Sequence, residues 1–335
     1  MNIAYILYPF MLAFVVCLII GPATIKIIQK LKFGQQVRDD GPASHLKKQN
    51  VPTMGGIMMV IALIVCAIVF RFSSSALIAF LATMGYALIG FLDDFIKIIK
   101  KRSLGLKAYQ KIIGQFGIAI ITAIYAYNSN LIGSEIFVPF GVGYVDIGVW
   151  YIPFALFVII AIVNGVNLAD GLDGLASRMS MVQSITLAVL IAGAALGAQN
   201  LEQATDLKGL ALFASATAGA CLGFLRFNSY PARIFMGDTG ALGLGGAIAL
   251  TALFSKMALL LPIMCIMLVA TCVSVILQVG SYKLRHGKRI FKMAPLHHHY
   301  ELLGYHETTV TSMYTIITIV ACVLTLMIST QFPNF

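Results

Sequence analysis

Asn164-Gly-Val-Asn-Leu-Ala-Asp-Gly-Leu-Asp-Gly-Leu-Ala176 is the stretch on which the interpretation of this chain turns. It follows directly on an apolar run, residues 152–163, and carries two amides, two carboxylates and three glycines. Carboxylates at the mouth of a membrane-length segment are costly unless they hold a cation or a partner, so a functional site is expected here. Its oxygens suit Mg²⁺, a ribose, a base or a phosphate. The alternative is an Asn/Asp/Gly loop that only turns the chain back.

The composition indicates a membrane protein. The chain has 335 residues, of which 59% are hydrophobic and 11% charged, and its charges lie between long apolar runs. Runs of roughly 17 to 25 residues can cross a bilayer as helices. We therefore predict an all-α polytopic membrane protein, one domain over residues 1–335. Ten spans are expected, near residues 4–28, 53–70, 76–96, 111–127, 150–167, 179–197, 208–226, 239–255, 258–280 and 308–330.

The basic residues predict the orientation of these spans. Of the 23 Lys and Arg residues, 20 fall on one set of loops and span ends, and only Arg71, Lys208 and Lys256 fall on the other. By the positive-inside rule, both termini face out and five loops face the cytoplasm. This topology accounts for most of the net charge of +10, and since no soluble basic domain exists, a nucleic-acid partner is not expected.

Two further features have a structural interpretation. The longest outer loop, residues 128–148, holds β-prone runs on either side of Gly141-Val-Gly143, a pattern that predicts a small hairpin acting as a cap or contact surface. The six cysteines all fall inside predicted spans without paired spacing, so we expect apolar packing rather than disulfides or zinc ligands.

The first two inner loops offer groups for phosphate chemistry. In the first, a basic set (Arg38, His45, Lys47 and Lys48) and the backbone amides near Thr53 could grip phosphates, although a basic loop after a first span is ordinary topology. In the second, adjacent Asp93 and Asp94 would point about 100° apart on a helix, one toward a reaction centre and the other toward Lys97 at i+3. Such a pair suits metal-assisted phosphoryl transfer, or it is a solvated helix end.

The fourth and fifth inner loops add a carboxylate and a histidine run. Asp238 lies between glycines at the expected start of a helix, where it could bind a metal, lie beside a phosphate or act as a plain N-cap. Phe235 could stack on a base or simply pack. His297, His298 and His299 are consecutive, and adjacent rings do not converge on zinc as an H-x-x-x-H pair does, so phosphate contact is favoured over metal.

Taken together, these loops resemble a known family. Its ordered motifs are matched by Arg38-Asp-Asp-Gly-Pro42 with Pro52-Thr-Met-Gly-Gly56, by Asp93-Asp94 with Lys97, by the stretch from Asn164 to Gly174, by Phe227-Asn228 with Phe235-Met-Gly-Asp-Thr-Gly240, and by Ala294-Pro-Leu-His-His-His299. The family is that of the polyprenyl-phosphate N-acetylhexosamine-1-phosphate transferases, and the last motif favours its phospho-N-acetylmuramoyl-pentapeptide branch over the N-acetylglucosamine-1-phosphate branch. Ala169 and Tyr300 stand where Thr and Phe are common in the family.

The resemblance implies a reaction and a set of partners. The expected activity is transfer of phospho-MurNAc-pentapeptide from UDP-MurNAc-pentapeptide to undecaprenyl phosphate, giving lipid I and UMP with Mg²⁺. A homodimer in the bacterial plasma membrane is implied, with the active site on its cytoplasmic face. Both direct attack and a covalent aspartyl intermediate remain open.

The resemblance also implies roles for individual residues. The expected catalytic residues are Asp93, Asp94, Asp238 and His297, with Asp238 as the Mg²⁺ ligand and Asp93 the leading candidate base. The expected substrate-binding residues are Lys47, Thr53, Lys97, Lys107, Asn164, Asn167, Asp170, Gly171, Asp173, Asn228, Phe235 and His298.

Two other protein classes are disfavoured by where the polar residues lie. A secondary transporter would place charges near the bilayer midplane in symmetric halves, whereas here they lie at the inner ends of spans or in loops. A membrane scaffold would not need five loops with phosphate-compatible chemistry. Within the enzyme class, the alternative is the sister transferase that uses UDP-N-acetylglucosamine.

Overall fold

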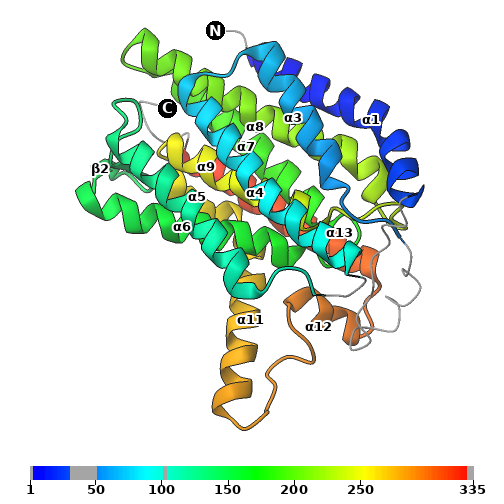
Figure 1. Cartoon of the computed structure of the whole chain (residues 1–335). Coiled ribbons are helices and arrows are strands. Elements are labelled where there is room, and N and C mark those ends of the chain that lie inside the picture. Colours follow the sequence, from blue (N-terminus) through cyan, green and yellow to red (C-terminus); the bar gives the residue numbers. More distant parts are fainter. Residues whose placement is uncertain (1–2, 31–50, 101–103, 330–335) are drawn as a thin grey trace.

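The computed structural model describes residues 3–30, 51–100 and 104–329, and long helices dominate it (Figure 1). Its α-helices are α1 (Leu7–Lys30), α3 (Gly56–Phe70), α4 (Ser74–Ile99), α5 (Ala108–Asn128), α6 (Tyr151–Ala169), α7 (Leu175–Leu196), α8 (Leu201–Asn228), α9 (Gly237–Phe254), α10 (Leu261–Met264), α11 (Ile266–Leu284), α12 (Leu296–Leu302) and α13 (Glu307–Ser329). Strands β1 (Glu135–Val138) and β2 (Gly143–Asp146) and three short 3-10 helices, Ile3–Ile6, Gly148–Trp150 and Ala258–Leu260, complete the described elements.

The predicted membrane character is confirmed. Within the described ranges, eight helices are long and apolar enough to cross a membrane, so this is a multi-pass membrane protein. Helices α3 and α5 also coincide with predicted spans, but α3 has only 15 residues and α5 is not among the eight. Ten spans, outward termini and cytoplasmic loops therefore stay predictions. All six cysteines are free thiols, as expected.

Two helix boundaries differ from the prediction. Helix α3 begins at Gly56 rather than near 53, because the preceding residues bond to a distant loop: the Gly55 and Gly56 N–H groups donate to the carbonyls of Phe235 and Met236. The span predicted at 258–280 is interrupted and becomes one continuous helix only at Ile266. Pro262 stands in the first turn of α10, where proline is well tolerated because the N–H it lacks would have no partner within the helix. A new helix therefore starts here.

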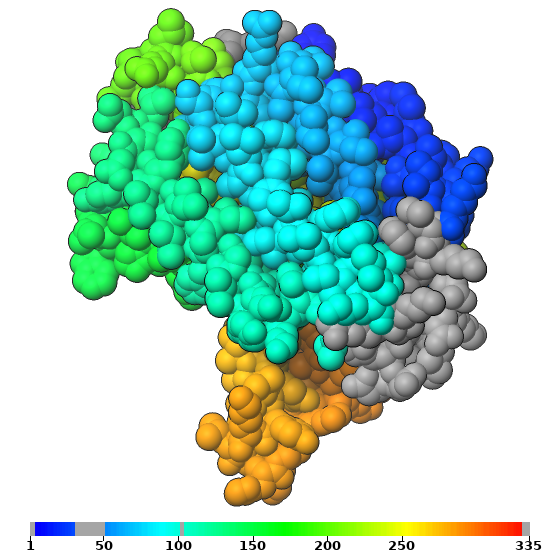
Figure 2. All heavy atoms as spheres, viewed as in Figure 1, coloured from blue at the N-terminus to red at the C-terminus, as the bar shows by residue number. Residues whose placement is uncertain are grey.

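Helix α9 forms the centre of the bundle, packed against α3, α4 and α6, while α8 packs against α1 and α7. Small residues allow backbones to approach closely inside a membrane. A Cβ at Gly245 of α9 would lie 2.5 Å from the Cα of Val163 in α6, a contact that glycine alone permits. Helix α11 packs against α6 through its first half, where Leu268 and Cys272 lie beside Gly165, and its far end projects from the main body (Figure 1, Figure 2).

The predicted hairpin is confirmed and lies against the C-terminal end of α9. Strands β1 and β2 pair antiparallel, with Val138 opposite Gly143. The Phe137 N–H donates to the Lys256 carbonyl over 2.8 Å, and the Lys256 Nζ lies 2.7 Å from the Glu135 carboxylate. The hairpin therefore ties down the end of α9 that is remote from Asp238.

Close packing of α8 on α1 predicts that alanine is poorly tolerated at Gly219, in contrast to Gly117 on α5. A Cβ at Gly219 would lie 2.0 Å from the Phe10 carbonyl oxygen, whereas one at Gly117 on α5 would meet nothing within 4 Å. We expect Gly219→Ala to destabilise the fold by about 1–3 kcal/mol through overpacking. Gly117→Ala should be neutral or slightly stabilising. Thermal unfolding in detergent measures both, and equal midpoints for the two variants would contradict this packing.

Candidate active site

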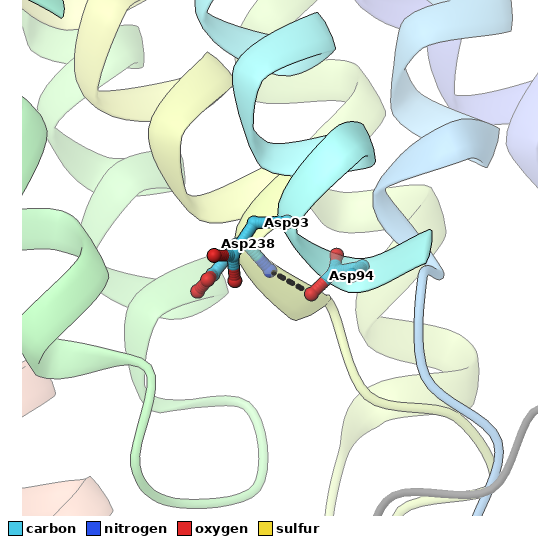
Figure 3. Close-up of side chains that lie close together, drawn as sticks. All are labelled: Asp93, Asp94 and Asp238. Atoms are coloured by element: carbon cyan, nitrogen blue, oxygen red, sulfur yellow. Dashed lines mark hydrogen bonds between the residues drawn. The ribbon is translucent and has the colours of Figure 1, made fainter. Parts of the chain in front are cut away.

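Three carboxylates meet where α4 crosses the start of α9. Asp93 and Asp94 lie near the C-terminal end of α4, and Asp238 stands in the first turn of α9. One oxygen from each lies within 4.8 Å of the others (Figure 3). The crossing depends on Gly90, because a Cβ there would lie 2.0 Å from the Asp238 carbonyl oxygen. Asp93 and Asp94 are buried, each with an exposed fraction of 2%, and Asp238 is half-buried.

Asp94 binds the N-terminus of α9. Its carboxylate accepts the Asp238 N–H at 3.2 Å, the Thr239 N–H at 3.0 Å and the Thr239 hydroxyl at 2.8 Å. These amides belong to the first turn of a helix, whose donors have no partner within the helix and whose dipole favours a negative charge. The cap of α9 thus comes from a different helix, and the alternative of Asp238 as N-cap is not needed.

Asp93 faces the cations of the cluster. Its Oδ1 accepts the Leu106 N–H at 2.9 Å, and its Oδ2 lies 2.6 Å from the Lys97 Nζ. The expectation that the second carboxylate of the pair meets Lys97 at i+3 is therefore only partly correct, since the Asp94 contact is longer, at 3.5 Å. Lys97 prefers its i+4 neighbour, and both positions lie on the same helical face.

Asp238 is contacted by side chains from three other helices. Its Oδ2 lies 2.9 Å from the Lys97 Nζ and 2.6 Å from the Lys111 Nζ, and its Oδ1 accepts the Asn167 amide N–H at 2.7 Å. Helices α4, α5, α6 and α9 thus all contribute to one cluster. The sequence reasoning counted Lys111 among the basic residues but left it out of the site. The sequence does carry a signal for including Lys111 in the site. Lys107, Lys111 and Gln115 are spaced by four and form a polar row on an otherwise apolar helix.

The two amides of the central stretch have different partners. Asn167 reaches Asp238, whereas the Asn164 side chain donates to the Gln115 side chain at 2.7 Å and to the Ile160 carbonyl. Asn164 therefore joins α6 to α5. Its contact with substrate stays a prediction.

The carboxylates of the same stretch also divide. Asp170 is half-buried at the end of α6, and burial, with the carboxylates of Asp238 and Asp94 next in size, raises its pKa to about 8. Lys97 acts in the opposite direction. Asp173 is buried and its Oδ2 accepts the Ala232 N–H at 2.9 Å, so its carboxylate fixes a neighbouring loop. Asp170 has the more accessible carboxyl of the two.

The histidine run packs onto the central stretch. His297 is buried, and a Cβ at Gly171 would lie 2.3 Å from its Nε2, so the imidazole rests directly on that glycine. His298 Nδ1 lies 2.8 Å from the Glu301 carboxylate. His299 Nδ1 accepts the Lys292 N–H at 3.2 Å. The His297 and His298 rings contact each other edge to face, with centroids 4.3 Å apart, whereas the His299 ring lies against Phe291.

The remaining predicted residues occupy three kinds of position. Thr53 and Phe235 lie on paired segments, since the Phe235 N–H donates to the Pro52 carbonyl beside Thr53 at 2.8 Å. Asn228 is buried, accepting from the Ser177 hydroxyl and donating to the Ile234 carbonyl, and so holds the loop after α8. Lys107 is exposed at the start of α5. Lys47 lies outside the described residues.

Comparison with known proteins identifies the family. The model of glycosyl transferase family 4 matches residues 74–256. A phospho-N-acetylmuramoyl-pentapeptide-transferase of Clostridioides difficile strain 630 is 46% identical over 321 residues, 96% of each chain. One of Thermoanaerobacter sp. strain X514 is 48% identical over 310 residues, 92% of this chain and 94% of the relative. This chain belongs to the phospho-N-acetylmuramoyl-pentapeptide-transferase family.

The family model and the relatives cover different parts of the site. In this phospho-N-acetylmuramoyl-pentapeptide-transferase family member, the glycosyl transferase model covers α4 to α9, and so all three clustered carboxylates. His297 lies beyond it, within the part that the full-length relatives match. A third relative, from Clostridium novyi strain NT, is 46% identical over 95% of each chain.

The raised pKa of Asp170 predicts a pH-dependent stability in the absence of divalent ions. The folded protein holds this proton up to about pH 8, while an unfolded carboxyl releases it near 3.8. Between these values the folded state binds more protons, so the free energy of unfolding falls as pH rises. Asp170→Asn, a neutral isostere, should therefore gain stability over the parent from pH 5 to about pH 8 and keep that advantage at pH 9.

Thermal unfolding of both proteins with a chelator, from pH 5 to pH 9, measures this difference. The other acids are common to the two proteins and cancel in the comparison. Parallel curves would show that Asp170 is ionised throughout.

Proposed function

We propose that this protein transfers phospho-MurNAc-pentapeptide from UDP-MurNAc-pentapeptide to undecaprenyl phosphate, giving lipid I and UMP, the first membrane step of peptidoglycan synthesis. The observation that carries the proposal is the group of three carboxylates with Lys97 and Lys111, gathered from separate helices at one end of a membrane bundle. Family membership supports the same reaction, because the relatives are named for it.

The reaction must bring two anions together. The lipid phosphate and the UDP pyrophosphate repel each other, so positive charge must be present where the metaphosphate-like transition state forms. Lys97 and Lys111 supply two ammonium groups within hydrogen-bonding distance of Asp238. Both are bound to carboxylates here, and we expect them to bind phosphate oxygens when substrates are present.

The carboxylate cluster fits a magnesium ion. Mg²⁺ takes hard oxygen ligands, usually one or two carboxylates together with substrate phosphates. Asp238 would hold it, since the Asp94 oxygens are already bound to the first turn of α9 and Asp93 is the candidate base. When bound, the ion would neutralise negative charge on the phosphates.

Individual side chains have separate roles in the transfer step. We infer that an oxygen of the lipid phosphate attacks the phosphorus that carries the sugar, while the bond to the UMP oxygen breaks. Asp93, whose Oδ2 lies 2.6 Å from the Lys97 Nζ, is the candidate to accept a proton from the lipid phosphate. The alternative, attack by an aspartate to give a covalent intermediate, would use the same residue.

The uridine is assigned to the loop after α6. A protonated Asp170 would present one O–H donor and one acceptor oxygen, which match the O4 acceptor and the N3–H donor of uracil. Phe235 is half-buried on the paired segment and offers an aromatic face for stacking. His297, resting on Gly171, would lie near the pyrophosphate.

The setting of the reaction follows from the membrane and the charges. We propose that the cluster faces the cytoplasm of a bacterial plasma membrane, because the basic residues gather at that end. The lipid acceptor would enter from the bilayer, and the protein would act as a homodimer.

A substrate test decides the function. Purified protein with Mg²⁺ and undecaprenyl phosphate is offered UDP-MurNAc-pentapeptide or UDP-N-acetylglucosamine in parallel, and lipid product and UMP are measured. We expect turnover with the first substrate only. Turnover with UDP-N-acetylglucosamine alone would assign the chain to the sister activity, and turnover with neither would refute the proposal.

Two substitutions test the roles within the cluster. Asp93→Asn and Asp238→Asn should each lower kcat by at least roughly 10²-fold, through loss of the base or of a metal ligand. Asp146→Asn, on the exposed face of the hairpin, is the matched control and should keep full activity. Thermal unfolding confirms that each variant is folded. A folded Asp93 or Asp238 variant with near-normal turnover would remove that residue from the catalytic set.

A further inference from the structure

Glu307 is a buried carboxylate that takes no part in the proposed chemistry. It stands in the first turn of α13 with an exposed fraction of 7%. A first-turn acid is stabilised by the dipole of its own helix, which would explain an exposed glutamate. Burial of a carboxylate, however, is costly unless hydrogen bonds compensate for it. The contacts that Glu307 makes outside its own helix therefore indicate its role.

The main contact joins α13 to the loop between α6 and α7. The Asp173 N–H donates to the Glu307 Oε1 over 2.6 Å, across 134 positions of the sequence. A hydrogen bond to an ionised acceptor is shorter and stronger than one between neutral groups. This bond fixes the backbone three residues after Asp170, the residue assigned to the uridine.

Asp173 extends the connection to a second loop. Its carboxylate accepts the Ala232 N–H at 2.9 Å, in the segment that leads to Phe235. Next to Glu307, the His306 ring meets the Tyr230 ring edge to face, with centroids 5.3 Å apart. The start of α13 therefore holds both loops that are assigned to the nucleoside.

We propose that Glu307 is a positioning residue that fixes residues 170–174 for binding of the UDP-linked substrate, acting through the Asp173 amide. The inference rests on the proposed function. Glu307 is expected to affect the affinity for the UDP-linked substrate and not the rate of the chemical step. The carboxylate cluster is anchored separately: Asp94 binds Thr239, and Lys97 and Lys111 bind Asp238. Loosening the loop should therefore weaken UDP-substrate binding while the reacting groups keep their places.

The test compares steady-state kinetics of three full-length variants with the parent enzyme. Glu307→Ala should raise KM for UDP-MurNAc-pentapeptide about tenfold, the size expected when a hydrogen bond to a charged group is lost. KM for undecaprenyl phosphate and kcat should stay within about threefold. Glu307→Gln keeps a carbonyl acceptor and should restore most of the affinity. Glu202→Ala removes an exposed first-turn acid from α8 and is the matched control, with parental kinetics expected.

Three kinetic results would contradict the positioning role of Glu307. An unchanged KM in Glu307→Ala, or a Gln variant as impaired as the Ala variant, would overturn the positioning role. A fall in kcat alone would also overturn it, because partial unfolding reduces active enzyme without changing KM. If Glu307→Ala does not fold, Glu307→Asp takes its place, since the shorter side chain should raise the same KM by about threefold.

Hydrogen–deuterium exchange gives a readout that does not depend on turnover. Amides of residues 170–175 should exchange faster in the Ala or Asp variant than in the parent, and those of α9 should not change. If the parent shows no turnover with this substrate, the proposed function fails and exchange alone decides whether Glu307 fixes the loop. Unchanged exchange in residues 170–175 would refute it.

Discussion

The crossing of α4 over the first turn of α9 is the constraint on which the rest of the structure depends. Gly90 lets the two backbones approach, and Asp94 then accepts the amides that open α9. A helix start buried without acceptors would leave several donors unsatisfied inside a membrane, at a cost of several kcal/mol each. One carboxylate thus makes a buried helix start possible, and the same crossing places Asp93 beside Asp238.

Charge balance explains why α5 belongs to the site. Three carboxylates so close together repel one another, and this repulsion is strong where water is scarce. Lys97 from α4 and Lys111 from α5 offset it through Asp238. Helix α5 is otherwise rather exposed along its length, so this ion pair is a large part of what ties its first turns to the bundle.

The sequence was informative where a pattern is local and less so where partners are distant. Apolar run length located the helices, and Gly141-Val-Gly143 located the hairpin, because both depend on neighbouring residues. The carboxylates were found because acids at span ends are rare. Which amide Asp94 accepts, or that Lys111 reaches Asp238, depends on packing between segments more than 100 residues apart. Likewise, the buried contacts of Asn228 and Asp173 could not be separated from ligand contacts by residue type alone.

Helix α9 is held at both ends, by Asp94 at its first turn and by the hairpin at Lys256, and it is buried along most of its length. Such a rod has little freedom to tilt or slide. The donor proposed above, a peptide-bearing nucleotide sugar, would nevertheless have to enter, and its product would have to leave. We therefore expect substrate exchange to displace α11 and short α12, which project from the main body, rather than α9.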